Sequence, residues 1–460
     1  MKKIIKLGIF TLMIALLSSC SKWIDPEINV DPDAPAAVTM DLLVPSIEAE
    51  LAFTVVGGND VTRPQAMWMQ QLTGIARQSE AQGRYLFRSN NVSNLWASIY
   101  SGIGMDATVL MNQAAEKQSP HIVGVAKVLM AINIGMTTDM WGDIPYSEAF
   151  QGKDNLTPAF DSQENIYSAV QALLDGAIND LSNADNAVDI NGDFIYGGNT
   201  QAWINAANAL KARYFIHLSE VDGGSYGKAL TAANAALDGG FEDMKFNWAE
   251  SETGANPLYQ FMRDRGDVVM GKTFIDMMNE SSDPRLPQYA TFAADTTIYY
   301  GSSMTDLNAN ASSPGPGVAS NSSPTFFMML SELYFIKAEA ELASDEAAAK
   351  SDIKNAMSAS MASYGVDATD WVNDYVTANI DTKSGDELKK ELFKQKYIAL
   401  FYQQEVWTDF RRSNNILGLV KNPNADKDFP VRFPYAQTSV DYNTNTPPVG
   451  EITDKIWWDK

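Results

Sequence analysis

Residues 200–237 read TQAWINAANALKARYFIHLSEVDGGSYGKALTAANAAL, and the order of large and small apolar residues in this stretch decides the fold class. Apolar residues recur every three or four positions, first over residues 203–214 and again over residues 226–237. This period predicts two helices, each with one apolar face. The aspartate and glycines at 222–224 predict the turn between them. The stretch therefore predicts a helix pair whose alanines allow a close approach.

The same pairing recurs further along the chain. SELYFIKAEAEL at 331–342 is followed by EAAAKSDIKNAMSASMASYG at 346–365, and a less regular pair leads into DELKKELFKQKYIALFYQQEVWTDFRRS at 386–413. Helix pairs with a period of about 34 residues are close to the tetratricopeptide pattern, and such units stack on one another. We therefore expect a mainly α fold with a tetratricopeptide-like helix-pair scaffold over about 95–245 and 325–415.

Helical periodicity also dominates much of the remaining sequence, whereas strand-like alternation is scarce. Short strand-like patches occur at TTIYYG (296–301) and FPVRFPY (429–435). The other segments that we expect to be helical are 42–53, 61–78, 93–116, 121–142 and 162–184.

One long segment departs from the helical pattern. Residues 246–324 are expected to form a loop-rich insertion, in which residues 281–325 are rich in Ser, Asn, Gly and Pro and contain no lysine. Long insertions without regular structure are usually either functional or disordered. The adjacent Tyr299 and Tyr300 favour a functional loop. We therefore expect an irregular, loop-rich half that carries the ligand-binding site.

The N-terminus has the features of a secretory signal. Three early lysines precede an uncharged, mostly apolar run at 7–17, which is shorter than the roughly 20 apolar residues that span a bilayer. The single cysteine, Cys20, ends the sequence LSSC, which resembles the lipobox of bacterial lipoproteins. We expect a signal peptide at 1–19, acylation of Cys20 and an extended tether over 20–38. An ordinary exported protein without acylation is the alternative.

The charge and the cysteine count exclude several classes of partner. The chain has 34 Lys and Arg against 57 Asp and Glu, a net charge of −23. Nucleic acids and anionic lipid surfaces are bound by basic patches. A single cysteine leaves no disulfide framework and no thiolate metal site. An acidic, aromatic-rich and cysteine-poor exported chain is typical of extracellular glycan binders and glycan hydrolases.

A recognisable sequence occurs at 136–150, MTTDMWGDIPYSEAF, where a helix is expected to end at Gly142. It resembles the WGDxPY segment of the SusD/RagB family, which are nutrient-binding lipoproteins of Bacteroidetes outer membranes. Further segments resemble the family in the same order: NGDFIYGG to FIHLS (191–219), SDPRLPQY (282–289), LYFIKAEA (333–340), QKYIALFYQQEVWTDFRRS (395–413) and PVRFPYAQTSVDYNTN (430–445).

This resemblance implies a single SusD-like domain over 39–460. It also implies a non-enzymatic protein that captures an oligosaccharide or a peptide. We expect no catalytic residues, no metal and no cofactor. Such a protein is the lid subunit of a TonB-dependent transporter of the SusC type and is lipid-anchored at the outer membrane. We expect the protein on the outer face of this membrane. Only Asp25 and Glu27 follow Cys20 closely, which is fewer acidic residues than in many surface-exported relatives.

Two other functions stay open from the residues alone. The first is a secreted glycan hydrolase, because 57 acidic residues will place some pair at glycosidase spacing by chance. The second is a tetratricopeptide-type adaptor that binds a protein and no small ligand.

Three motifs that suggest catalysis or metal binding are better explained by local structure. GGSYG at 223–227 matches a nucleophile elbow, but it follows a helical pattern and both histidines precede its serine, so we expect a turn between helices. His121 and His217 lack the spacing of a zinc site, and His217 is expected to pack inside a helix. DINGDF at 189–194 lacks the glycine and glutamate that an EF-hand requires, so we expect a polar turn.

Aromatic side chains outside the helical patterns are the candidate sugar-binding residues. A pyranose ring has an apolar face that stacks on Trp or Tyr, while polar neighbours bind its hydroxyl groups. Trp96, Trp203 and Trp407 lie in helical patterns and are expected in the core. The candidate ligand-binding residues are Trp248, Tyr299, Tyr300, Tyr85, Arg84 and Arg265, with the two arginines as hydrogen-bond donors.

Overall fold

The computed structural model describes residues 38–448 and 450–460. The chain divides into two units, Met1–Thr39 and Met40–Lys460, and the second carries the helices and strands described below. The predicted signal peptide (1–19), Cys20 and the predicted tether up to residue 37 lie outside the described residues. The single domain over 39–460 stays a prediction.

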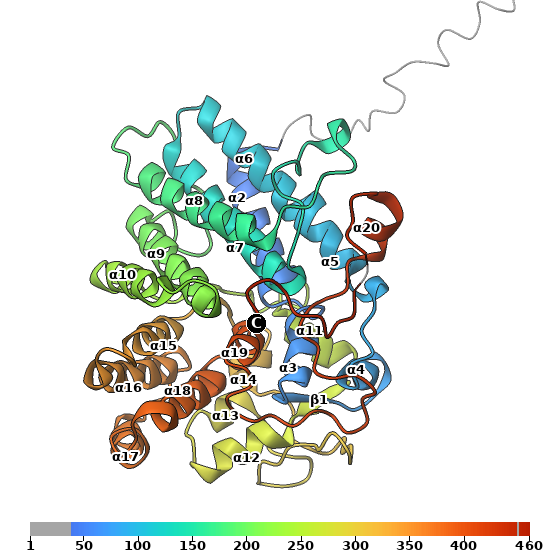
Figure 1. The fold of residues 1–460 in the computed structure, drawn as a ribbon, viewed down its shortest axis with the longest axis vertical. Coiled ribbons are helices and arrows are strands. Elements are labelled where there is room, and N and C mark those ends of the chain that lie inside the picture. The colour runs from blue at the N-terminus through green and yellow to red at the C-terminus, as the bar shows by residue number, and fades with distance from the viewer. Residues whose placement is uncertain (1–37, 449) are drawn as a thin grey trace, which may run out of the picture. The chain divides into compact units, whose positions relative to one another are not determined.

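Three helix pairs pack in succession and form the scaffold of Met40–Lys460 (Figure 1). The first pair contacts the second through α8 and α9, and the second contacts the third through α10 and α15. The mainly α, tetratricopeptide-like fold is therefore confirmed, and the stretch that predicted it forms α9 and α10. The pairs are α7 (Pro120–Trp141) with α8 (Gln163–Leu181), α9 (Thr200–Ile216) with α10 (Ser225–Asp238), and α15 (Leu330–Glu341) with α16 (Glu346–Ser363).

Glycines allow the central helix α7 to approach its neighbours. A Cβ atom on Gly135 would lie 2.3 Å from the ring of Tyr214 on α9, and one on Gly124 would lie 2.6 Å from Leu181 on α8. The helix ends at Gly142, whose φ of 81° is a conformation that glycine adopts readily. The predicted helix end at this residue is therefore confirmed.

By length and composition α7 could cross a bilayer, since it has 22 residues and few charged ones. However, most of its residues are buried, and it packs against α6, α8 and α9. Helices that are apolar on every side are also typical of protein cores. We therefore interpret α7 as the core helix of the scaffold.

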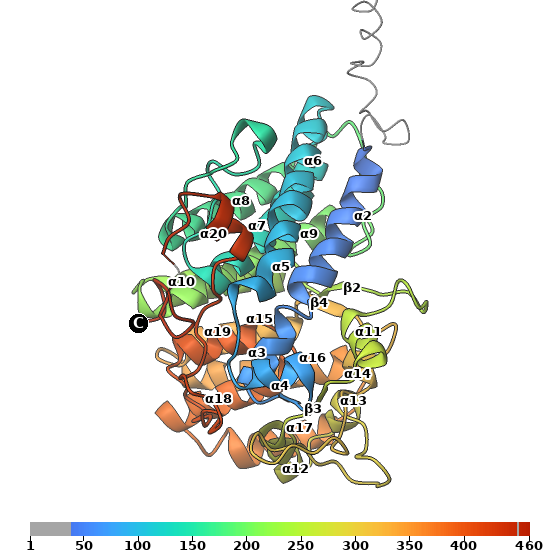
Figure 2. The same ribbon diagram turned by 90° about the vertical axis from the view of Figure 1, so that its right-hand side faces the viewer.

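The N-terminal helices run along the scaffold, and α2 lies beside α6 (Figure 2). The predicted helix at 93–116 is continuous, although its middle turns are wider π-helix. The described helical elements before α7 are α2 (Met40–Glu50), η2 (Leu51–Val56), α3 (Thr62–Trp68), α4 (Arg77–Gly83), η3 (Ser89–Val92), α5 (Ser93–Ala97), η4 (Ser98–Gly104) and α6 (Met105–Glu116).

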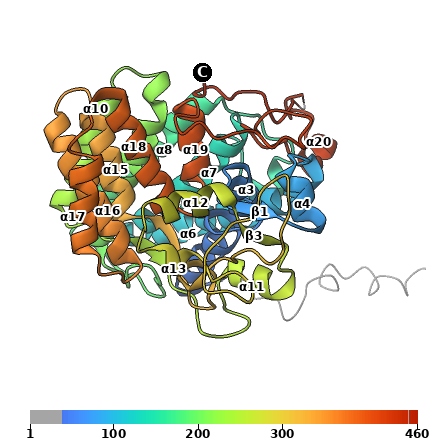
Figure 3. The same ribbon diagram turned by 90° about the horizontal axis from the view of Figure 1, so that it is seen from below.

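Short helices and loops surround two small antiparallel sheets, and Figure 3 shows this irregular part beside the helix pairs. Leu72 pairs with Met270 in one sheet, and Met244 pairs with Met328 in the other. The strands are β1 (Leu72–Gly74), β2 (Met244–Phe246), β3 (Val268–Met270) and β4 (Thr325–Met328). The remaining helices are η5 (Gly152–Asp154), η6 (His217–Glu220), α11 (Pro257–Asp264), α12 (Lys272–Glu280), α13 (Leu286–Tyr289), α14 (Pro316–Ala319), α17 (Thr369–Asn379), α18 (Gly385–Ala399), α19 (Glu405–Arg412) and α20 (Gln437–Tyr442).

One prediction of local structure is wrong. Residues 61–78 form α3, β1 and the start of α4 instead of one helix. The strand-like patches at 296–301 and 429–435 form no strand, although their backbones hydrogen-bond to other segments, as Phe433 N does to Met140 O (2.7 Å). Strand formation depends on a partner that is distant in the sequence, so local alternation is a weak guide.

Segments that are far apart in the sequence meet in the core. Trp141 Nε1 donates to Pro434 O (2.8 Å), and Trp407 Nε1 donates to Pro430 O (2.7 Å). The ring of Phe433 lies 5.4 Å from that of Trp141 and 5.6 Å from that of Trp407. The segments that carry the family resemblance therefore build the core. The tryptophans that were predicted to be buried, Trp96, Trp203 and Trp407, are buried.

Candidate functional site

A cleft of about 440 Å³ opens between the helical run α5–η4, residues 145–158 and α20. Helix α20 lies against α5 (Figure 2), so the C-terminal segment closes one side of the cleft. The volume is in the range of small-ligand sites. The lining residues are Trp96, Ala97, Tyr100, Ser101, Met105, Pro145, Ala149, Phe150, Gln151, Gly152, Asn155, Leu156, Pro158, Thr438, Ser439, Tyr442 and Asn443.

Aromatic rings form a continuous row along this cleft. The ring of Tyr100 lies 4.7 Å from that of Trp96 and 5.8 Å from that of Phe150, onto which it stacks at an interplanar angle of 23°. The Tyr100 hydroxyl donates to Pro145 O (3.0 Å). Burial raises the pKa of Tyr100 well above its usual range, and Tyr435 and Asp161 add to this effect. Tyr100 is therefore a neutral, fixed ring.

Backbone geometry holds Phe150 in this row. Phe150 has a φ of 60°, a left-handed conformation that is strained for a residue with a side chain. Its ring packs against η4 at Gly104, where an added Cβ atom would lie 2.1 Å from the ring. The glycine therefore provides the space that the phenylalanine ring occupies.

The loop after α7 is fixed by one carboxylate. Asp161 Oδ2 accepts hydrogen bonds from Tyr146 N (3.0 Å) and Ser147 N (2.8 Å), and Oδ1 accepts from Ser147 Oγ (2.8 Å). The backbones of Ile144 and Asp161 also exchange two hydrogen bonds. The WGDIPY segment therefore sets the start of the loop that forms one wall of the cleft.

Asparagines join the two walls of the cleft. Asn443 Nδ2 donates to Pro158 O (2.9 Å), and Asn445 Nδ2 donates to Thr157 O (2.7 Å). Beside these contacts the side chains of Tyr442 and Leu156 are 78% and 75% exposed. The rim of the cleft thus presents an exposed aromatic ring and an exposed aliphatic side chain, and hydrogen bonds between the two walls hold this rim in place.

This arrangement is chemically suited to a sugar. Aromatic rings present faces to the apolar side of a pyranose, and hydroxyl and amide groups bind its hydroxyl rim. Among the described residues that line the cleft, none is Asp or Glu. The cleft therefore lacks the flanking carboxyl pair with which glycoside hydrolases work.

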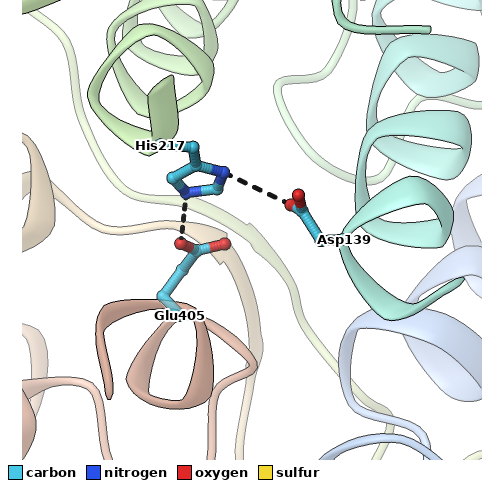
Figure 4. A group of neighbouring side chains, drawn as sticks. All are labelled: Asp139, His217 and Glu405. Carbon is cyan, nitrogen blue, oxygen red and sulfur yellow. Dashed lines mark hydrogen bonds and ion pairs between the residues drawn. The ribbon is translucent and has the colours of Figure 1, made fainter. Parts of the chain in front are cut away.

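A second cluster is buried in the scaffold, where His217 lies between Asp139 and Glu405 (Figure 4). His217 Nε2 is 2.8 Å from Glu405 Oε2, and Nδ1 is 3.3 Å from Asp139 Oδ2. Burial opposes protonation of His217, but Glu405 and Asp139 outweigh it and raise the pKa of His217 to about 9. The three residues offer atoms within 4.8 Å of one another, as metal ligands would.

We interpret this cluster as an ion-pair network and not as a metal centre. Arg213 Nε lies 3.6 Å from Glu405 Oε1, and the same guanidinium donates from Nε to Glu332 Oε1 and from Nη2 to Glu332 Oε2 on α15 (both 2.6 Å). This guanidinium would repel a cation bound at Glu405. The protonated imidazole already takes the place of the cation between the two carboxylates. The sequence spacing did not reveal this cluster, because its members come from α7, η6 and α19.

The sequence profile of a SusD-like family, described as "Starch-binding associating with outer membrane", matches residues 32–436. The chain belongs to this SusD-like family. The resemblance that was inferred from the WGDIPY segment and its companions is confirmed. No curated protein sequence matches the chain.

Solved SusD-like structures share the fold. A SusD/RagB family protein of Bacteroides thetaiotaomicron is 23% identical, with 92% of this chain and 99% of that chain covered and a TM-score of 0.78. A chitin-binding SusD homolog of Flavobacterium johnsoniae is 19% identical, with 92% and 97% covered and a TM-score of 0.75. A SusD homolog of Bacteroides fragilis is also 19% identical, with 92% and 100% covered and a TM-score of 0.75.

The SusD-like fold does not bring the six predicted site residues together around the cleft. Arg84 is exposed, forms an ion pair with Glu80 (3.4 Å) and lines a separate pocket of about 60 Å³. Tyr85 is 2% exposed, and its hydroxyl accepts from Asn422 N (3.0 Å). Arg265 is exposed, and its carbonyl accepts from the Arg77 guanidinium (2.7 Å).

The other three predicted residues lie in the loop-rich part. Trp248 is half-buried between Phe53 and Phe246, and its Nε1 donates to Thr325 Oγ1 (2.9 Å). Tyr299 is half-buried and its ring lies 4.7 Å from that of Phe292. The Tyr300 hydroxyl donates to Asn310 O (3.1 Å). Their role in binding stays a prediction.

The cleft residues were missed because no local pattern marks them. Tyr442 and Phe150 lie within or beside segments that were noted only for the family resemblance. Trp96 was assigned to the core, which is correct, yet it also lines the cleft. One available signal was an aromatic residue a few positions after WGDIPY, where the chain leaves the helix.

The remaining motifs have structural explanations. GGSYG at 223–227 contains the start of α10, and Ser225 is fully buried there, which confirms the predicted turn between helices. In DINGDF, Asp193 accepts from the backbone N–H groups of Ile195, Tyr196 and Gly198 and from Trp203 Nε1. The predicted polar turn is therefore organised by the buried carboxylate of Asp193, which binds the backbone of the residues that follow it.

Proposed function

We propose that the protein captures an oligosaccharide nutrient at the outer membrane and binds it in the cleft beside α20. The observation that carries the proposal is the row of aromatic rings, with an exposed tyrosine at the rim, on the fold of a starch-binding family. Two solved relatives with this fold are chitin-binding proteins. A carbohydrate ligand is consistent with each of these findings.

The proposal includes a non-enzymatic role. The absence of Asp and Glu from the described lining residues supports binding without hydrolysis. It also includes acylation of Cys20 and action as the lid of a SusC-like, TonB-dependent transporter, as the family resemblance implies. Co-purification of a transporter barrel with the full chain from native membranes would support this part, and its absence would contradict it.

Titration calorimetry with maltoheptaose and chitohexaose tests the binding site. We expect the wild-type chain to bind at least one of them and Tyr442→Ala to weaken binding tenfold or more, which corresponds to about 1.4 kcal/mol. Tyr442 is 78% exposed, so its removal should leave the melting temperature unchanged.

Trp248→Ala and Tyr300→Ala serve as matched controls, because both remove an aromatic ring outside the cleft. If the cleft is the binding site, both variants bind like the wild type. If they lose affinity while Tyr442→Ala does not, the site lies in the loop-rich part and the cleft is wrong. Release of shorter sugars during incubation with the purified chain would contradict the non-enzymatic role.

A further inference from the structure

The cleft is uncharged along its whole described lining. None of its described lining residues is Lys, Arg, His, Asp or Glu, although a fifth of the chain is charged. An uncharged site in such a chain indicates an uncharged ligand.

Four polar side chains in the cleft are free to bind a ligand. Within the described part of the chain, nothing hydrogen-bonds the side chains of Ser101, Gln151, Thr438 or Tyr442. In contrast, Asn155 and Asn443 are engaged, since Asn155 Nδ2 donates to Glu148 O (3.2 Å) and Asn443 Nδ2 donates to Pro158 O (2.9 Å). The polar groups that remain are three hydroxyls and one amide.

Hydroxyl and amide groups match neutral sugar hydroxyls and acetamido groups. They offer no counter-charge to a carboxylate, a sulfate or an ammonium group. Burying such a group without a partner of opposite charge is costly, and anionic groups are typically bound by arginine or lysine. The net charge of −23 adds a further repulsion toward anionic chains at low salt.

We propose that the cleft selects uncharged oligosaccharides, composed of hexoses or N-acetylhexosamines, over uronic-acid, sulfated or free-amino sugar chains. This inference rests on the proposed function of the same cleft. The half-buried rings of Tyr100 and Phe150 and the exposed ring of Tyr442 receive the apolar sugar faces. The free groups of Ser101, Gln151 and Thr438 receive the hydroxyl rim.

Matched hexamers that differ in charge test the inference. Chitohexaose is compared with its deacetylated, cationic form, and maltohexaose and cellohexaose are compared with the anionic hexagalacturonate, by calorimetry with the full chain at 50 mM and 500 mM salt. We expect at least one neutral hexamer to bind tenfold or more tighter than either charged one. Its affinity should change less than twofold with salt, since no ion pair forms.

The experiment distinguishes a failure of the inferred selectivity from a failure of the proposed function. If a charged hexamer binds as tightly as the neutral ones and Tyr442→Ala weakens it, the cleft is the binding site but the selection for neutral ligands is wrong. If no hexamer of either kind binds, the proposed function fails and this inference fails with it.

A charge introduced into the cleft gives a second measurement. Gln151 is exposed, so Gln151→Lys and Gln151→Glu should fold like the wild type. We expect Gln151→Lys to tighten hexagalacturonate binding fivefold or more and Gln151→Glu to do the same for the cationic hexamer. Ser251→Lys, at an exposed site outside the cleft, should change neither. Unchanged preferences in both Gln151 variants would overturn the inference.

Discussion

Glu48 on α2 is a carboxyl group that the fold keeps neutral. It is fully buried, and its Oε2 accepts from Phe194 N (2.8 Å) beside the carboxylate of Asp193. Burial, with the charge of Asp193, raises the pKa of Glu48 to about 10. In the unfolded chain the group has an ordinary pKa near 4.5. Folding at neutral pH therefore requires Glu48 to take up a proton.

Glu48→Gln should stabilise the protein, and more so as the pH rises. The wild type loses stability above pH 4.5 because the unfolded state holds fewer protons than the folded one. Glutamine keeps the shape and cannot ionise, so we expect a gain of about 1–3 kcal/mol at pH 8 and almost none at pH 4.5. Urea unfolding at both pH values measures it. Asp189→Asn, an exposed change in the neighbouring loop, is the control, and a gain that does not vary with pH would contradict the assignment.

The contribution of His217 to stability also falls as the pH rises. In Glu48 the proton keeps a buried acid neutral, whereas in His217 the proton creates a cation that two carboxylates stabilise. Its folded pKa is about 9, against 6.5 for an ordinary histidine, so its stabilising effect is complete below pH 6.5 and is lost as the pH rises through 9. His217→Gln leaves Glu405 and Asp139 without their shared cation. We expect a loss of about 3–5 kcal/mol at pH 6 and a smaller loss at pH 9. Unfolding free energies from urea titrations at these two pH values decide it, and an equal loss at both would contradict it.

At the level of elements, the sequence predicts what is local. Helix pairs such as α9 and α10 repeat an apolar face every three or four residues, and this pattern persists whatever packs against it. β1 has three residues, and Leu72 pairs with Met270, which lies far away in the sequence. No window around residue 72 contains that partner, so the segment was predicted as part of a helix. The boundaries of short elements depend on such distant contacts.

Gly104 in η4 is an element-level feature of the cleft. A Cβ atom at this position would lie 2.1 Å from the Phe150 ring, so Gly104→Ala must displace Phe150 and the wall that carries it. We expect a tenfold or greater loss of oligosaccharide affinity and a destabilisation of about 1–3 kcal/mol from overpacking. Calorimetry and thermal unfolding measure the two effects.

Gly227→Ala is the matched control for Gly104→Ala. Gly227 lies within α10, and a Cβ atom there would meet nothing within 4 Å. Alanine favours a helix over glycine by up to about 1 kcal/mol, so this variant should bind normally and melt at the same or a higher temperature. Normal affinity in Gly104→Ala would show that the Phe150 ring does not shape the site.

For the whole molecule, the motifs identified the fold and left the site unidentified. Trp141, Trp407 and Phe433 lie in the segments that resemble the family, and they meet in one core where each ring contacts another. The cleft is assembled from three separate segments, and side chains at its rim, such as Tyr442 and Leu156, are exposed. Core residues are constrained by neighbours on every side, whereas rim residues such as Tyr442 are constrained only by a ligand. A family pattern therefore predicts the first group and not the second.

The whole molecule is expected to attach to the membrane through Cys20, which lies outside the described residues. Acyl chains stabilise membrane attachment by about 0.8 kcal/mol for each buried CH₂ group, so two or more chains anchor a protein durably. The net charge of −23 gives the body no attraction of its own to an anionic lipid surface. We therefore expect the wild-type chain in the membrane fraction with incorporated labelled palmitate.

Cys20→Ala should remove the label and move the chain to the soluble fraction, or leave it as uncleaved precursor, whereas Ser19→Ala should behave like the wild type. The exported body should still bind oligosaccharide, because the cleft residues lie more than 70 positions after the cysteine. A Cys20→Ala chain that is cleaved, unlabelled and still firmly in the membrane fraction would contradict lipid anchoring. Attachment would then have to come from a partner protein, and washing with high salt or urea would release it.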